Sequence, residues 1–172
     1  MSSRNTTDIW QEVAGRITRR NITAAVIGLG YVGLPISCSM FSKNLRVIGL
    51  DIDSEKIKLL NNGKSYIGGV PDLAIYEAVQ KHTFLPTTDF AKIKEADFII
   101  VCVPTPLDHD NKPDLSYVET TTSEVARHLR KGQIVVLEST TYPGTMRDIV
   151  LPILEEESAL KHEKDFFVAY SP

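Results

Sequence analysis

Cysteine is scarce in this sequence, and so are long apolar runs and any excess of positive charge. Two cysteines, Cys38 and Cys102, are too few for a disulfide framework, and their spacing does not suit a metal site. The longest apolar runs are far shorter than the roughly 20 residues that span a bilayer, and the first 20 residues lack the apolar core of a secretion signal. A net charge of −3 gives no electrostatic reason to expect nucleic acid or an anionic membrane as a partner. These absences predict a cytoplasmic protein without a metal site.

The remaining composition is that of one ordinary globular domain. Of the 172 residues, 42% are apolar and 24% are charged, which allows one substantial core. Residues 7–19 place four apolar side chains on one face of a helix, with arginines around them. These side chains are Ile9, Trp10, Val13 and Ile17. We therefore expect residues 1–20 to form a helical extension, packed on the domain or on a neighbour outside this chain, and residues 21–172 to form the domain.

The most informative segment is residues 22–33, ITAAVIGLGYVG, where an apolar run leads directly into three glycines. A strand with this ending can turn sharply at Gly28, let a pyrophosphate approach the backbone at Gly30 and seat a helix close to the sheet at Gly33. Unpaired N–H groups and the helix dipole then stabilise the phosphate charge. A helix pattern follows the glycines, so we favour dinucleotide binding over a purely structural glycine turn.

An acidic residue follows at the distance that a dinucleotide site requires. The next predicted strand, residues 46–51, ends in Asp51, whose carboxylate can accept hydrogen bonds from both hydroxyls of the adenosine ribose. A 2′-phosphate would meet like charge there, so the sequence favours NAD over NADP. Asp53 is expected to cap the following helix. Lys56, one turn into that helix, either leans back over the adenosine or is a solvated surface residue.

Helical and strand patterns alternate through the rest of the chain. Expected strands cover residues 22–28, 46–51, 97–103, 133–139 and 165–170, and expected helices cover residues 31–43, 54–62, 88–95 and 114–130. Further helices follow Pro71 and Gly144, the latter with a kink at Pro152. Strands joined by helical crossovers predict a single α/β domain, a Rossmann-type doubly wound parallel sheet with ligands at the carboxyl ends of its strands.

Two loops after predicted strands contain unusual polar or rigid residues. The segment VPTPL, residues 103–107, has two prolines around Thr105, which can offer a hydroxyl and a backbone N–H to a ligand. The segment ESTTYPGT, residues 138–145, gathers hydroxyls at the end of the next strand. Both loops are also explained as turns, with Ser and Thr capping the next helix. Because both follow strands on the nicotinamide side of such a sheet, we favour a binding role.

Five ordered segments, VIGLGYVGLP, LDIDSEK, VCVPTPL, ESTTYPGT and AYSP, resemble the N-terminal domain of the UDP-glucose/GDP-mannose 6-dehydrogenase family over residues 22–172. LNNGKSYI followed by PD, together with STTYPGT, is most similar to the UDP-N-acetylhexosamine enzymes, such as the UDP-N-acetylglucosamine 6-dehydrogenases. The resemblance implies that Gly28, Leu29, Gly30, Tyr31, Val32 and Gly33 hold the pyrophosphate, with Asp51 on the ribose and Lys56 on the adenosine side. It also implies a nicotinamide wall made of Val103, Pro104, Thr105, Pro106, Leu107, Ser139, Thr140 and Thr141. Thr140 would in addition help to position the water and the oxyanion near the substrate.

The resemblance also implies an activity and a departure from it. Family members oxidise the 6-hydroxyl of a UDP-sugar to a carboxylate with two NAD, through an aldehyde held by a cysteine as a thiohemiacetal. This chain stops at Pro172, before the family's catalytic glutamate, lysine, asparagine and cysteine and its UDP-binding domain. We therefore expect an NAD-binding piece without turnover, from a homo-oligomeric enzyme. UDP-glucose oxidation, a non-enzymatic dinucleotide sensor and a 3-hydroxyacid dehydrogenase are the alternatives. We further expect Thr141 to turn toward the cap of the next helix.

Overall fold

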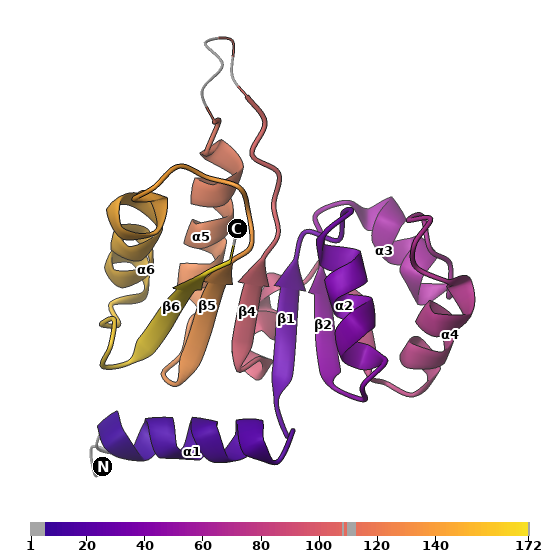
Figure 1. The fold of residues 1–172 in the computed structure, drawn as a ribbon, viewed down its shortest axis with the longest axis horizontal. Helices are drawn as coiled ribbons and strands as arrows, with labels where there is room; N and C mark the ends of the chain where they lie inside the picture. The colour runs from indigo at the N-terminus through magenta and orange to yellow at the C-terminus, as the bar shows by residue number, and fades with distance from the viewer. Residues whose placement is uncertain (1–5, 108, 110–112, 172) are drawn as a thin grey trace.

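A computed structural model describes residues 6–107, 109 and 113–171, so residues 1–5 of the predicted extension and Pro172 lie outside it. Six parallel strands form one sheet in the order β3-β2-β1-β4-β5-β6 (Figure 1). This order confirms the predicted doubly wound sheet, which extends outward on either side from the neighbouring strands β1 and β4. The strands are β1 (Thr23–Ile27), β2 (Arg46–Leu50), β3 (Phe84–Thr87), β4 (Phe98–Val101), β5 (Gln133–Leu137) and β6 (Phe166–Tyr170).

Helices cover both faces of the sheet because successive strand residues point into two different cores. On β1, Ala25 and Ile27 belong to one core, whereas Val26 belongs to the other. The first core includes side chains of the 3₁₀ helix η1 (Phe90–Glu95), α5 (Ser116–His128) and α6 (Leu151–Ser158). The second includes side chains of α2 (Gly33–Phe41), α3 (Ser54–Asn61) and α4 (Asp72–Gln80). Burial on both faces explains why the strands are almost continuously apolar.

One strand was not predicted from the sequence. Strand β3 has four residues, FLPT, and pairs only with β2, so that Pro86 lies opposite Gly49. A proline cannot donate a hydrogen bond to a sheet and argues against a strand, except at an edge. Since β3 is an edge strand, it accommodates Pro86, and its short length gave no alternation to recognise.

Just before Pro152, where the sequence predicts a kink, the structure has a wider helical turn. A π-helical segment, η2 (Met146–Val150), precedes α6, and the N–H of Leu151 donates to the carbonyl of Met146, five residues earlier. Proline has no N–H to donate, and its ring crowds the carbonyl four residues before it. The π turn accommodates this crowding, and α6 continues beyond it.

Helix α1 (Thr6–Thr18) packs on the domain itself and lies across the amino ends of the strands (Figure 1). The Trp10 ring contacts that of Phe167 on β6, with centroids 4.0 Å apart. Val13 is 8% exposed, whereas Ile17, predicted on the same apolar face, is 41% exposed. No helix among the described residues is long and apolar enough to cross a membrane.

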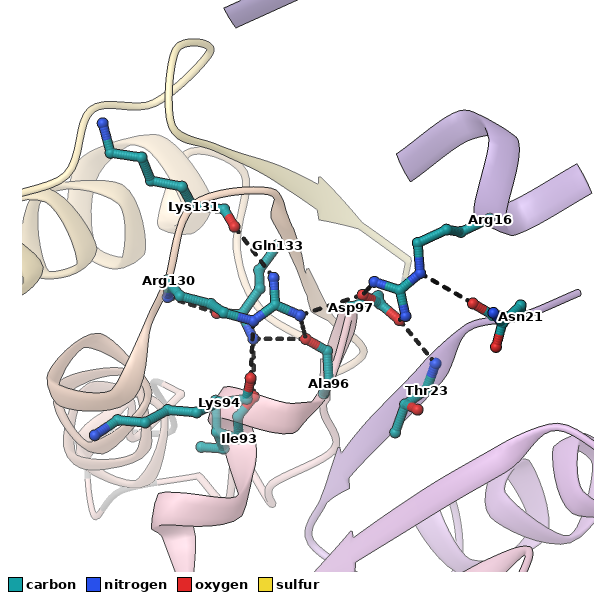
Figure 2. A network of polar contacts seen from close by, with 10 residues as sticks. All are labelled: Arg16, Asn21, Thr23, Ile93, Lys94, Ala96, Asp97, Arg130, Lys131 and Gln133. Carbon is teal, nitrogen blue, oxygen red and sulfur yellow. Dashed lines mark hydrogen bonds and ion pairs between the residues drawn. The ribbon is translucent and has the colours of Figure 1, made fainter. Parts of the chain in front are cut away.

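A buried carboxylate connects α1 to the sheet, as Figure 2 shows. Asp97, at the start of β4, is 1% exposed. It accepts two hydrogen bonds from the guanidinium of Arg16, at 2.6 and 2.9 Å, and one from Arg130 at 3.2 Å. The backbone N–H of Thr23 donates a further bond at 2.9 Å. Four donors thus compensate the desolvation of this charge, which would be costly if unpaired.

Candidate functional site: a cleft at the carboxyl edge of the sheet

A cleft of about 530 Å³ opens where the strand order reverses between β1 and β4. Segments that follow β1, β2, β4 and β5 line it. In open α/β sheets, ligands collect at such a switch point. Of the predicted site residues, those that line the cleft are Gly28, Gly30, Tyr31, Val32, Asp51, Lys56, Val103, Pro104, Thr105, Ser139 and Thr140. The predicted residues that do not line it are Leu29, Gly33, Pro106, Leu107 and Thr141.

The three glycines meet different requirements. Gly28 has a φ of +88°, and a Cβ there would lie 2.5 Å from the carbonyl oxygen of Cys102. A Cβ on Gly33 would lie 1.9 Å from the carbonyl oxygen of Gly28. The packing of the turn on itself and on the chain after β4 therefore requires both glycines. A Cβ on Gly30 would meet no atom within 4 Å, so its surroundings are open for a ligand to approach the backbone.

Asp51 holds a fixed negative charge at the end of β2. Its side chain is buried, with the residue 7% exposed, and its two oxygens accept backbone N–H groups from Leu29 at 2.9 Å and from Asp53 at 3.0 Å. Each carboxylate oxygen can accept more than one hydrogen bond, so capacity remains for a ligand. Because the bond to Leu29 spans the two segments, the carboxylate and the glycine turn are positioned together.

The two neighbours of Asp51 on α3 have different roles. The Asp53 carboxylate accepts from the N–H groups of Glu55 and Lys56 at 3.0 and 3.3 Å, which confirms that it caps α3. Lys56 places its Nζ 3.5 Å from an Asp51 oxygen and 5.9 Å from the ring centroid of Tyr66. Lys56 therefore lies beside Asp51 in the cleft, and its contact with adenosine stays a prediction.

Two hydrogen bonds join the loops after β4 and β5 into one wall. The Thr105 hydroxyl donates to the Thr140 carbonyl at 2.7 Å, and the Ser139 hydroxyl donates to the Val103 carbonyl at 2.7 Å. A hydroxyl has one hydrogen, so neither has a donor left for a ligand, although both can still accept. The sequence suggested Thr105 as a donor to a ligand, whereas the structure uses that donor to hold the wall together.

The hydroxyls of Thr140 and Thr141 have different surroundings. Thr140 is exposed and lines the cleft, and among the described residues its hydroxyl has no hydrogen-bond partner. The Thr141 hydroxyl lies 3.5 Å from that of Tyr170. The expectation that Thr141 caps the following helix is wrong, because the helical segment begins after Thr145 without a side-chain cap. Tyr170, on the neighbouring strand, offers the nearer partner.

Several lining residues were not predicted: Ile27, Ile52, Phe90, Cys102, Tyr117, Thr121 and Glu138. Tyr117 and Thr121 are four residues apart on α5 and so share one helix face, a pattern that the sequence does contain. Ile52 follows Asp51 directly and is 82% exposed, which offers an apolar surface beside the carboxylate. The convergence of η1 and α5 on the cleft depends on tertiary packing and has no local sequence pattern.

Cys102 lines the cleft as an unreactive thiol. It lies just past β4, which ends at Val101 and not at residue 103 as predicted. Burial, and secondarily the nearby Glu138 carboxylate, raise the pKa of Cys102 to about 12. A thiol that stays protonated is a poor nucleophile. In the part of the chain that the structure describes, no group of His, Cys, Asp or Glu is arranged to hold a metal ion. The arrangement therefore suits ligand binding rather than covalent catalysis by this thiol.

Comparison with known proteins identifies relatives of this chain. Protein CapL of Staphylococcus aureus is 44% identical over 154 residues, which are 89% of this chain and 34% of that protein. UDP-N-acetyl-D-glucosamine 6-dehydrogenase of Pseudomonas aeruginosa is 35% identical over 153 residues, 89% of this chain and 35% of that protein. The crystal structure of an NDP-N-acetyl-D-galactosaminuronic acid dehydrogenase from Methanosarcina mazei Go1 matches with a TM-score of 0.84 at 31% identity. That match covers 98% of this chain and 37% of the other.

The extent of these matches defines what this chain represents. It spans about a third of the length of the curated relatives that it matches. A model of the UDP-glucose/GDP-mannose dehydrogenase family, NAD binding domain, matches residues 22–172, which include the whole sheet and the cleft. The chain therefore belongs to the UDP-glucose/GDP-mannose dehydrogenase family, and residues 22–172 are its NAD-binding domain.

Proposed function

We propose that NAD binds in the cleft at the carboxyl edge of the sheet, with its pyrophosphate at the glycine turn and its adenosine ribose at Asp51. One observation carries this proposal: the open backbone at Gly30 and the buried Asp51 carboxylate are joined through the N–H of Leu29. Backbone N–H groups at the start of α2 suit a pyrophosphate, and a fixed carboxylate suits two ribose hydroxyls. The apolar side chain of Ile52 offers a surface for the adenine.

The wall formed by the loops after β4 and β5 is proposed to hold the nicotinamide end of NAD. It contains Val103, Pro104, Thr105, Ser139 and Thr140. When bound, NAD supplies the hydride acceptor, and the protein supplies binding and orientation. Because Thr105 and Ser139 tie the two loops together, this wall is ordered before a ligand arrives, which reduces the entropy lost on binding.

The longer protein is proposed to oxidise the C6 hydroxyl of a UDP-sugar to a carboxylate with two NAD. UDP-N-acetylhexosamine is the favoured substrate, since a relative that is 35% identical is named UDP-N-acetyl-D-glucosamine 6-dehydrogenase. UDP-glucose is the alternative. A cytoplasmic location and a homo-oligomer formed through other regions of the protein are part of the same proposal.

Calorimetric titration of the chain with NAD and NADP tests the role of Asp51. NAD should bind more tightly, because a 2′-phosphate would lie against the Asp51 carboxylate. Asp51→Asn should weaken NAD binding about tenfold, the usual effect of losing a charge-assisted hydrogen bond, and should narrow the preference for NAD. Asp53→Asn is the matched control, because asparagine also caps helices well and Asp53 does not line the cleft. Equal or tighter binding of NADP by the unchanged chain would contradict the proposal.

A further inference from the structure

The loop between α3 and α4 contains a tyrosine that contacts the glycine turn from outside the cleft. The Tyr66 hydroxyl donates a hydrogen bond of 2.7 Å to the carbonyl of Leu29. Tyr66 is half-buried and packs against the core that contains Leu29, α2, α3 and α4. It does not line the cleft. Its segment, KSYI, belongs to the loop that resembles the UDP-N-acetylhexosamine enzymes, and the proposed NAD contacts do not include it.

Leu29 is held at three points. Its side chain is fully buried, its N–H donates to Asp51, and its carbonyl accepts from Tyr66. The peptide bond between Leu29 and Gly30 is planar and trans, so its C=O and N–H point in opposite directions. With the carbonyl turned toward Tyr66, the Gly30 N–H points away from Tyr66. Among the described residues this N–H has no hydrogen-bond acceptor, and Gly30 lines the cleft.

Because residue 30 is a glycine, the Leu29–Gly30 peptide can rotate into a second orientation. Residue 30 must lack a side chain for a ligand to approach, but glycine also adopts positive φ angles readily. Rotation of the Leu29–Gly30 peptide would therefore cost little backbone strain. The rotated peptide would present the Leu29 carbonyl oxygen, in place of the Gly30 N–H, to an anionic pyrophosphate. A bond that holds the Leu29 carbonyl on the opposite side removes this alternative.

We propose that Tyr66 is a positioning residue for the cofactor, which orients the Leu29–Gly30 peptide so that the Gly30 N–H faces the pyrophosphate. The inference rests on the proposed binding of NAD in this cleft. Burial, and next the carboxylates of Asp51 and Asp53, raise the pKa of the Tyr66 hydroxyl, so it remains a donor at neutral pH. Tyr66 also lies near Lys56, which approaches Asp51, so the ribose and pyrophosphate ends of the site share one set of supports.

The test is Tyr66→Phe, which keeps the ring and removes the hydroxyl. The Kd of NAD should rise about three- to tenfold, the range for one hydrogen bond. The Kd of adenosine, which has the ribose but no phosphate, should not change when both are measured by NMR titration. The Gly30 amide resonance should shift in the ligand-free variant. Tyr76→Phe is the matched control, because Tyr76 is 52% exposed and its hydroxyl has no hydrogen-bond partner among the described residues.

The outcomes separate this inference from the proposal on which it rests. Selective loss of NAD affinity, with an unchanged adenosine Kd and a shifted Gly30 resonance, supports the positioning role. Equal weakening of NAD and adenosine would overturn it, because the whole site would then be disturbed. Unchanged NAD affinity in Tyr66→Phe would also overturn it, while leaving NAD binding intact. If the unchanged chain fails to bind NAD, the proposed function itself fails.

Discussion

At the scale of single residues, three polar side chains of the cleft are held by hydrogen bonds before any ligand is present. Asp51 accepts from two backbone N–H groups, and the hydroxyls of Thr105 and Ser139 donate across the wall. These bonds hold Asp51 against the glycine turn and join the loops after β4 and β5. Thr140 differs, because its hydroxyl lines the cleft without a partner among the described residues.

This difference predicts the effect of removing the Thr140 hydroxyl on the oxidation that is proposed for the longer protein. Thr140→Ala should lower kcat by about 10²–10³-fold, the usual cost of losing a donor to a developing oxyanion. The KM for NAD should change little. Thr141→Ala should be milder, since the Thr141 hydroxyl lies near Tyr170 and outside the cleft. Steady-state kinetics of both variants make the comparison, and an unchanged kcat in Thr140→Ala would reduce Thr140 to a wall residue.

The raised pKa of Cys102 predicts how its thiol reacts and how it affects stability. The pKa rises from 9.0 to about 12, so the folded chain keeps a proton that the unfolded chain loses. The free energy of unfolding is therefore unaffected by ionisation of this thiol below about pH 9, and it declines as the pH rises toward 12. At pH 8, iodoacetamide should modify half-buried Cys38 but should modify Cys102 only after denaturation, as mass spectrometry can measure. Equal rates for the two thiols in the folded chain would contradict this.

Sequence reasoning succeeded for residues whose role is local and failed for those whose role depends on a distant partner. The turn at Gly28, the close packing at Gly33 and the cap at Asp53 follow from spacing over a few residues, and the structure confirms them. The bond from Tyr66 to Leu29 spans 37 positions and has no local pattern. Likewise, the sequence does not indicate that Thr105 uses its hydroxyl on a carbonyl 35 positions away.

At the scale of elements, helix α1 is the part whose placement the sequence left open. Its apolar face predicted a helix but did not identify the surface that it covers. The structure places it on the amino edge of the sheet, where Arg16 pairs with Asp97 and Trp10 contacts Phe167. Strand β3 was missed for a related reason, because its pairing with β2, rather than its own four residues, makes it a strand.

Arg16→Ala should release α1 from the sheet. The substitution removes two hydrogen bonds to a buried carboxylate and should lower the free energy of unfolding by about 1.5–3 kcal/mol. The remaining bonds from Arg130 and Thr23 keep Asp97 paired. Trp10 is the only tryptophan, so its emission should shift to the red as it leaves Phe167.

Arg19→Ala is the matched control for this change. It removes the same charge from an exposed position near the end of α1, where the described residues show no side-chain ion pair. The Trp10 emission and the unfolding midpoint of Arg19→Ala should match those of the unchanged chain. Unaltered Trp10 fluorescence in Arg16→Ala would show that the apolar contacts alone hold α1 in place. Both variants should bind NAD normally, because α1 lies across the amino ends of the strands (Figure 1), whereas the cleft is lined by segments after their carboxyl ends.

At the scale of the whole molecule, α1 and the proposed NAD site lie at opposite ends of the parallel strands. Parallel strands bring all their amino ends to one edge, where Asp97 and its partners connect β1, β4, β5 and α1 (Figure 2). They bring all their carboxyl ends to the other, where four loops form the cleft. Because the residues of the proposed NAD site follow the carboxyl ends of the strands, we expect all cofactor contacts at that edge.

An NMR titration of the ¹⁵N-labelled chain with NAD tests this placement most directly. Saturable amide shifts should cluster at Gly28, Gly30, Asp51 and Thr140, and should be absent around Gly132 at the opposite edge. Gly30→Ala should retain the unfolding midpoint, because a Cβ there meets no atom within 4 Å, yet it should abolish these shifts by occupying the space of the pyrophosphate. Shifts centred on the amino edge, or NAD binding that Gly30→Ala leaves unchanged, would contradict the account.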